Sequence, residues 1–272
     1  SNIGKVRSWG TELSVNYAKQ INDDWAIDFR GNFTYVENKY VEKDEPFYTY
    51  SWERRTGTPL SSTWGYVAEG LFRSQEEIDN SADQTGLGST PMVGDIKYRD
   101  LDGNGIINSH DQCMISEYGY QPRIQYGLGL NVNYKNFDFG VFFNGSAMRK
   151  IMVSGIHPFM QTDKVADKNI FKFIEGNYFT DEKQNFDAEY PRLGLMSTEV
   201  ANNHVNSTFW MRNGNFIRFK TLEIGYRFKY GRIYLNGDNL AVFSPFKLWD
   251  PELNWYSYPL QRTYNIGLQL NF

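Results

Sequence analysis

Apolar and polar residues alternate along much of the chain, and a period of two is the pattern of β-strands with one apolar face. The clearest run covers residues 25–36, where the apolar side is formed by Trp25, Ile27, Phe29, Phe33 and Tyr35. The pattern predicts strands over residues 5–20, 25–36, 124–134, 137–146, 208–228 and 232–243, and a last strand that ends at Phe272. The sequence therefore predicts an all-β protein of seven or so strands, with a bulge in strand 208–228.

The connections between these strands alternate between short turns and long loops. The loops cover about residues 40–121, 151–207 and 244–257. Ser74 and Glu77 predict a capped helix over 74–80, and residues 167–176 predict a second short helix, but the loops are otherwise expected to be irregular. Short turns at one end and long loops at the other are typical of outer-membrane barrels, whose apolar strand faces contact lipid and whose polar faces line the lumen.

The strand count indicates how much of a barrel this chain supplies. Seven strands would leave two open edges in lipid, and single-chain bacterial barrels have even strand numbers. The sequence therefore predicts an antiparallel transmembrane β-barrel of which the chain forms one part.

Composition agrees with this interpretation and excludes several functions. Aromatic residues make up 17% of the chain, which suits a β-rich protein with aromatic girdles. The net charge of -4 gives no sign of a nucleic-acid partner, and a single cysteine, Cys113, excludes an internal disulfide. No metalloprotease, serine-hydrolase, nucleotide-binding or dithiol motif occurs, so we expect no enzymatic activity.

The sharpest local motif is an acidic loop over residues 100–111, with the sequence DLDGNGIINSHD. Oxygen ligands at its alternating positions can wrap one hard cation, and the spacing matches a calcium loop. The expected ligands are Asp100, Asp102, Asn104, the carbonyl of Ile106, Asn108 and Asp111. Calcium would stiffen an external loop here. The alternative is a turn held together by its own side-chain hydrogen bonds.

Aromatic residues in the loops are a second set of candidates. Flat rings can stack on sugars or contact a protein partner. The candidates for substrate or partner contact are Tyr48, Tyr50, Trp52, Trp64, Tyr66, Trp249, Trp255 and Tyr256. For any one of them, packing within the loops is the competing interpretation.

Several sequence blocks resemble one family. These blocks are GDIKYRDLDGNGIINSHDQ at 94–112, GTPLSSTWGYVAEGLFRSQEEID at 57–79, YPRLG at 190–194 and FWMRNGNFIRFKTLEIGYRF at 209–228. In this order they resemble the SusC/RagA-type TonB-dependent outer-membrane transporters of Bacteroidota. The resemblance extends over residues 1–272 and implies the last third of a 22-stranded barrel, with neither the plug domain nor the TonB box in this chain.

The resemblance also implies a function and partners. Such transporters use energy relayed by TonB to import glycans or peptides across the outer membrane, and they pair with a SusD-like surface lipoprotein. The ending TYNIGLQLNF resembles the C-terminal signal of outer-membrane barrels, carried here by Asn265, Gly267, Leu270 and Phe272.

Two other functions fit parts of the sequence. A secreted soluble β-rich glycan-binding module with a calcium loop would bury its apolar strand faces against a second sheet and would have short loops at both ends. A structural barrel or adhesin would share the strands but lack the plug and the lipoprotein.

Overall fold

The computed structural model describes residues 4–153, 172–194, 197–253 and 257–271. The chain divides into two compact units, and we describe each by itself. We call the first the loop unit, which comprises residues 1–7, 39–119 and 151–212. The second, the strand unit, comprises residues 8–38, 120–150 and 213–272. No helix among the described residues is long and apolar enough to cross a membrane.

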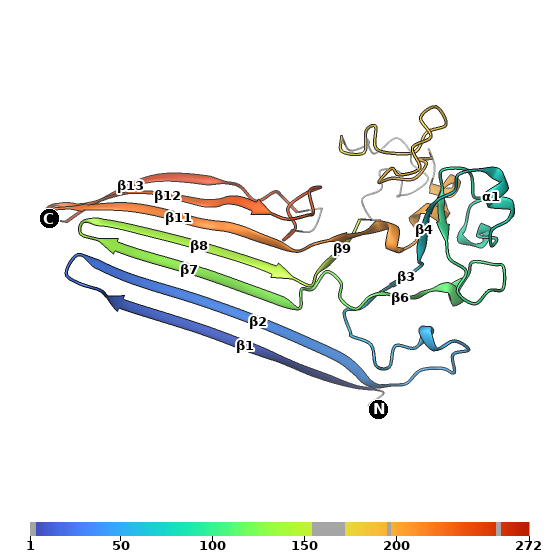
Figure 1. The fold of residues 1–272 in the computed structure, drawn as a ribbon, viewed down its shortest axis with the longest axis horizontal. Coiled ribbons are helices and arrows are strands. Elements are labelled where there is room, and N and C mark those ends of the chain that lie inside the picture. The colour runs from blue at the N-terminus through green and yellow to red at the C-terminus, as the bar shows by residue number, and fades with distance from the viewer. Residues whose placement is uncertain (1–3, 154–171, 195–196, 254–256, 272) are drawn as a thin grey trace. The chain divides into compact units, whose positions relative to one another are not determined.

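A seven-stranded sheet dominates the strand unit, as the alternation predicts (Figure 1). Its order is β1-β2-β7-β8-β11-β12-β13, so strands that follow one another along the chain are neighbours. The strands are β1 (Gly4–Gln20), β2 (Trp25–Lys43), β7 (Ile124–Tyr134), β8 (Phe137–Ala147), β11 (Phe216–Phe228), β12 (Gly231–Phe243) and β13 (Thr263–Leu270). The pairings from β2 to β13 are antiparallel.

Tight turns join the strands in pairs at one end of the sheet. Lys135, at a φ of 51°, lies in the left-handed region and lets β7 reverse into β8 within two residues. Trp25 packs against Tyr134 near this end with ring centroids 4.2 Å apart, and Phe137 packs against Tyr226 at 4.9 Å. The three long connections leave from the opposite ends of the strands, which confirms the predicted separation of turns and loops.

The two faces of the sheet differ in chemistry. On the apolar face the side chains are exposed, with Ile266 at 76% and Tyr264 at 70%. The opposite face carries the polar members of the same alternation, such as Asn236 opposite Asn265, which are joined by a side-chain hydrogen bond of 2.8 Å. No second sheet covers the apolar face within the described part of the strand unit.

The segment predicted as one strand over 208–228 is divided in the structure. A 3-10 turn at Thr208–Trp210 leads into β10 (Met211–Asn213), and β11 begins only at Phe216. The expected bulge is confirmed, because the register of β11 shifts between Phe219 and Thr221 against both neighbouring strands.

The loop unit is more regular than its sequence predicts, so the expectation of irregular loops is wrong. Short strands pair as β3 (Thr63–Gly65) with β6 (Cys113–Ser116), β4 (Ala68–Leu71) with β5 (Ile96–Tyr98), and β9 (Lys150–Met152) with β10. Short 3-10 helices cover η1 (Ser51–Glu53), η2 (Thr85–Leu87), η3 (Ser109–Asp111), η6 (Ser197–Glu199), η7 (Ala201–His204) and η8 (Thr208–Trp210). Strands of three or four residues are too short to show a period.

The two predicted helices have different outcomes. Helix α1 spans Gln75–Asp79, and the Ser74 hydroxyl caps it by accepting a hydrogen bond from the Glu77 N–H at 3.1 Å. Residues 172–176 form turns rather than a helix, and residues 167–171 of that prediction lie outside the described residues. Gly176 has a φ of 73°, which ends this turn in the left-handed region.

A buried polar cluster holds the loop unit together. We call it the Asp95 cluster, made of Asp95, Arg192 and Asn203. The Asp95 carboxylate is fully buried and accepts hydrogen bonds from Arg192 Nε at 3.0 Å, Arg192 Nη2 at 3.1 Å and Asn203 Nδ2 at 2.8 Å. The Asn203 carbonyl oxygen accepts from the Trp210 indole at 2.7 Å, so segments far apart in sequence meet at one carboxylate.

Candidate functional site

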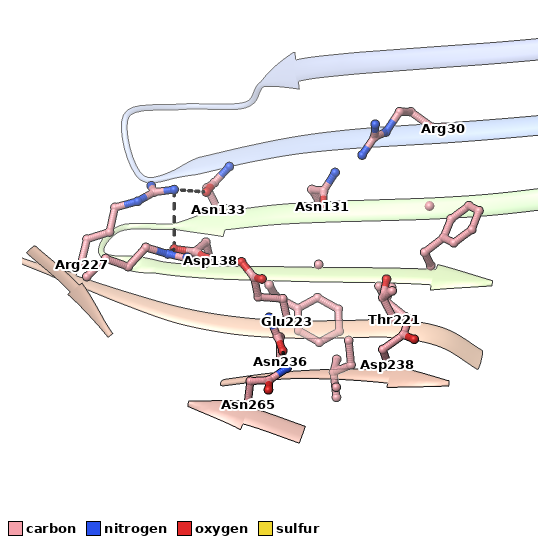
Figure 2. Close-up of a pocket in the computed structure, with 18 of the residues that line it drawn as sticks. Arg30, Asn131, Asn133, Asp138, Thr221, Glu223, Arg227, Asn236, Asp238 and Asn265 are labelled. Carbon is pink, nitrogen blue, oxygen red and sulfur yellow. Dashed lines mark hydrogen bonds and ion pairs between the residues drawn. The ribbon is translucent and has the colours of Figure 1, made fainter. Parts of the chain in front are cut away.

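The polar face of the sheet contains a wide cavity of about 1150 Å³ (Figure 2). Its lining residues come from β2, β7, β8, β11, β12 and β13, and most of them occupy polar positions of these strands. Those labelled in Figure 2 are Arg30, Asn131, Asn133, Asp138, Thr221, Glu223, Arg227, Asn236, Asp238 and Asn265. Amides and charges of both signs make this face able to hydrogen-bond a polar molecule.

Charges on this face largely satisfy one another. The Arg232 guanidinium donates to the Asp138 carboxylate, with Nε 3.0 Å from Oδ1, and forms an ion pair with Glu223. Arg227 lies 3.5 Å from the same Asp138 carboxylate. The Asp138–Arg232 pair crosses β11 above Gly225, where an added Cβ would collide with both side chains. The absent side chain of Gly225 therefore makes room for an ion pair between β8 and β12.

In the loop unit, the acidic loop brings carboxylates together. Ligand oxygens of Asp100, Asp102 and Asp111 all lie within 4.8 Å of one another. Asp100 accepts hydrogen bonds from the N–H groups of Gly103 at 2.7 Å and Gly105 at 2.8 Å. Burial acts to raise the pKa of Asp100, but these backbone hydrogen bonds outweigh it and hold the pKa below its ordinary value.

The same loop region is held by further hydrogen bonds and by side chains from η1. The Asn104 side chain accepts from the Ile106 N–H at 2.7 Å, and the Asn108 side chain accepts from the His110 N–H at 2.8 Å. Asp111 is fully buried and accepts from the Asn108 N–H at 2.8 Å. These bonds are those of a self-stabilised turn and are also compatible with a cation at the centre, so the calcium assignment stays a prediction.

Two of the predicted contact aromatics pack against this loop. Tyr50 and Trp52 stack with centroids 4.6 Å apart, and the Trp52 indole donates to the His110 carbonyl oxygen at 2.8 Å. A hydrogen bond to the Asp102 carboxylate raises the pKa of the Tyr50 hydroxyl. His110 Nδ1 lies 2.7 Å from Glu53 Oε1. Side chains of the segment 50–53 thus contact the acidic loop and hold it through hydrogen bonds.

The other predicted aromatics have varied surroundings. Tyr48 and Trp64 line a cavity of about 420 Å³, in which the Arg55 guanidinium lies 4.4 Å from the centre of the Trp64 ring. Tyr66 is buried against Tyr98, with centroids 5.5 Å apart. Trp249 packs edge-on against Phe246 at 4.5 Å. Trp255 and Tyr256 lie outside the described residues.

Most of the predicted C-terminal signal falls on β13. Asn265 and Gly267 share the polar face, where Gly267 leaves room for the ring of Tyr234 on β12. Leu270 is exposed on the apolar face. Phe272 lies outside the described residues.

Sequence reasoning did not single out the ionic cluster on the polar face. Asp138, Glu223, Arg227 and Arg232 each occupy polar positions of predicted strands, so the alternation places them on this face. Their mutual contacts depend on strand register, which the alternation alone does not fix.

Comparison with known proteins finds relatives along the whole chain, although no family model matches it. TonB-dependent receptor P26 of Formosa agariphila is 30% identical over 308 residues, covering 100% of this chain and 30% of the relative. TonB-dependent receptor P3 of the same organism is 26% identical over 311 residues, covering 100% of this chain and 29% of that protein. TonB-dependent receptor SusC of Bacteroides thetaiotaomicron is 24% identical over 294 residues, covering 100% of this chain and 27% of the relative.

Solved structures of the RagAB transporter share the fold. The structure described as the RagAB peptide transporter matches with a TM-score of 0.70 and 18% identity, over 100% of this chain and 30% of that chain. The RagAB peptide importer in its open-open state matches with a TM-score of 0.66 and 19% identity, over 99% of this chain and 29% of that chain. The chain therefore spans about a third or less of the length of the proteins it matches.

Proposed function

Because this chain belongs with the SusC/RagA-type TonB-dependent receptors, which are outer-membrane β-barrel proteins, we propose that it forms part of an importer. The importer takes up a glycan or peptide nutrient across the outer membrane with energy relayed by TonB. No covalent chemistry is required, and the relatives are named as receptors and transporters rather than enzymes.

The observation that carries this proposal is the opposed chemistry of the two sheet faces. The apolar face is exposed along all seven strands, as lipid contact requires, and the polar face holds the wide cavity. A soluble glycan-binding module would cover its apolar face with a second sheet, and the described part of the strand unit contains none. The two faces therefore favour an importer over the soluble module.

The partners follow from the same proposal. A SusD-like surface lipoprotein would cover the importer from outside, and TonB would act on a part of the importer outside this chain. In support, SusC is among the named relatives, and the matching solved structures are described as the RagAB peptide transporter and the RagAB peptide importer.

A pair of substitutions on β12 and β13 tests the membrane orientation in the full-length protein. Ile266→Lys places a charge on the apolar face, which costs about 2–4 kcal/mol at the bilayer midplane, so less protein should reach the outer membrane. Asn236→Lys, on the polar face of the neighbouring strand β12 and outside the C-terminal signal, is the matched control and should assemble normally. Equal assembly of the two variants would contradict the orientation.

Import itself is tested in cells that produce the full-length protein. Uptake of a labelled pool of oligosaccharides and peptides should be lost when TonB is deleted, while the amount of receptor in the outer membrane stays the same. Uptake that continues without TonB would refute the proposed mechanism.

We also propose that the acidic loop binds calcium and that the ion stiffens the loop unit. The converging carboxylates of Asp100, Asp102 and Asp111 support this proposal. Added calcium should slow hydrogen exchange of residues 100–111, and Asp100→Asn should remove the effect. Asp181→Asn, which changes an exposed carboxylate of the loop unit outside the acidic loop, should leave the calcium effect intact. Identical exchange with calcium and with a chelator would eliminate this role.

A further inference from the structure

A second cavity on the polar face lies where the strands meet the loops. It has a volume of about 340 Å³ and is lined by residues of β7, of β8 and of the segments next to them, together with Asn32, Phe216 and Glu252. We call it the Arg149 pocket, with Tyr120, Asn144, Ser146 and Arg149 as its defining residues. All of them belong to the strand unit.

Arg149 is the unusual member of this pocket. Its side chain is only 4% exposed, although arginine is almost never buried without an ion-pair partner. The residue before it, Met148, has a φ of 54°, a left-handed conformation that an ordinary side chain adopts only at a cost. The backbone is therefore strained at Met148, the residue next to the buried Arg149.

The nearby carboxylates of Asp250 and Glu252 attract Arg149, but each is in direct contact with a different guanidinium. Asp250 lies 2.6 Å from Arg218 Nη2, and Glu252 lies 3.1 Å from Arg218 Nε, so both are engaged by a different guanidinium. Within the described residues, Arg149 forms no ion pair, and its Nε has no hydrogen-bond acceptor. Its clearest neighbour is Tyr120, whose ring centre lies 4.1 Å from the guanidinium carbon and whose hydroxyl is also a hydrogen-bond partner of Arg149.

An aromatic ring compensates a buried cation only in part, and a guanidinium cannot shed its proton to escape burial. Two further polar atoms in the pocket lack partners within the described chain, the Ser146 hydroxyl and Asn144 Oδ1. Together they offer a cationic donor, a hydroxyl and an amide acceptor in one cavity. The wide cavity on the same face differs, because its arginines already pair with Asp28, Asp138 and Glu223.

We propose that the Arg149 pocket is a carboxylate-binding subsite for the transported molecule. The carboxylate accepts hydrogen bonds from Arg149 and from the Ser146 hydroxyl, and a neighbouring N–H or O–H of the same molecule donates to Asn144 Oδ1. A peptide end and an acidic sugar share this chemistry. The subsite rests on the proposed import function, because the substrate is its source of ligand.

Binding to the purified full-length receptor, measured by calorimetry, tests the subsite and distinguishes the two sources. Two pairs of probes are compared. Trialanine, with a free carboxylate, is compared with trialanine amide, and trigalacturonate is compared with the neutral galactotriose. One acidic probe should bind more tightly than its neutral counterpart, and the pair that shows the difference identifies the source. Equal binding within both pairs would overturn the proposal.

Variants then assign the effect to the pocket. Arg149→Gln should weaken binding of the acidic probe about 10- to 100-fold and leave its neutral counterpart unchanged. Arg149→Lys should restore part of the affinity. Ser146→Ala leaves Arg149 in place and should weaken binding of the acidic probe several-fold. This variant tests the pocket even if the arginine variants fail to fold.

The matched control is Arg262→Gln, which removes an exposed arginine of the strand unit outside this pocket. Equal losses in Arg149→Gln and Arg262→Gln would overturn the subsite, because they would show only general attraction between charges. The assay needs no TonB. Arg149-dependent binding therefore supports the subsite even if import fails, and TonB-dependent import without Arg149-dependent binding refutes the subsite alone.

Discussion

Arg192→Ala is the sharpest test of how the loop unit is held together. The substitution removes the only guanidinium that the structure places on the Asp95 carboxylate within the described residues. Asp95 would keep its hydrogen bonds from Asn203 and from the Met92 N–H at 2.9 Å, but it would remain a fully buried anion without a cation.

The expected loss follows from burial. Removing one partner of a buried ion pair costs about 3–5 kcal/mol, and Arg192 is 18% exposed, which favours the lower end, about 3 kcal/mol. Because 1.4 kcal/mol is a factor of ten, opening of the unit should become roughly 100-fold more frequent.

Arg99→Ala provides a matched control in the same unit. Arg99 and Glu69 are also 3.0 Å apart, but their side chains are 55% and 34% exposed. Such a pair contributes about 0–1 kcal/mol, so its loss should raise opening by no more than roughly fivefold. The comparison separates the effect of burial from that of distance.

Hydrogen exchange of the full-length receptor measures both variants. Exchange is followed at residues 94–98. The Ile96 N–H donates to the Asn203 side chain at 2.8 Å, so we expect it to exchange only when the Asp95 cluster opens. Combining Asp95→Asn with Arg192→Leu removes both charges and should recover much of the lost protection. Similar exchange in Arg192→Ala and Arg99→Ala would refute the role of the buried pair.

Two further predictions concern single residues. Burial lowers the pKa of His204 to about 4 from 6.5, so acidification between these values favours the unfolded segment, which takes up the proton. The free energy of unfolding of the loop unit should fall by up to about 3 kcal/mol across this window, and His204→Asn should flatten the profile in denaturant titrations. Gly225→Ala should separate Asp138 from Arg232 and lower the temperature at which the full-length barrel unfolds on a gel, whereas Gly31→Ala, whose new methyl meets only ordinary contacts of 3.4–3.5 Å, should change it less. Equal shifts in the two glycine variants, or an unchanged pH profile in the histidine variant, would count against these assignments.

The sequence alone was sufficient for the sheet because its strands are long. The strands β7, β8, β11 and β12 are eleven or more residues long, so their alternation is recognisable even where β11 carries a bulge. The exception is the segment 208–228, which the sequence predicts as one strand. In the structure Gly214 and Asn215 belong to no strand and separate β10 from β11.

The loop unit was beyond sequence reasoning for a physical reason. Arg192 and Asp95 are 97 residues apart, and nothing local to either residue indicates the other. Arg149 was equally hidden, because a single arginine after a predicted strand is most often a solvated charge. Acidic-loop residues were found because their spacing is itself the signal, whereas burial and missing partners appear only in three dimensions.

The long reach of the Asp95 cluster has a consequence for the order of folding. Its hydrogen bonds join residues 97 to 108 positions apart, whereas the hairpin of β7 and β8 closes over two residues. Closing a chain segment becomes entropically harder with length, and contacts between distant residues form late. The hairpins should therefore assemble first and the loop unit last, so a newly made chain would pass through a stage in which its strands are paired and its loop unit is not yet folded.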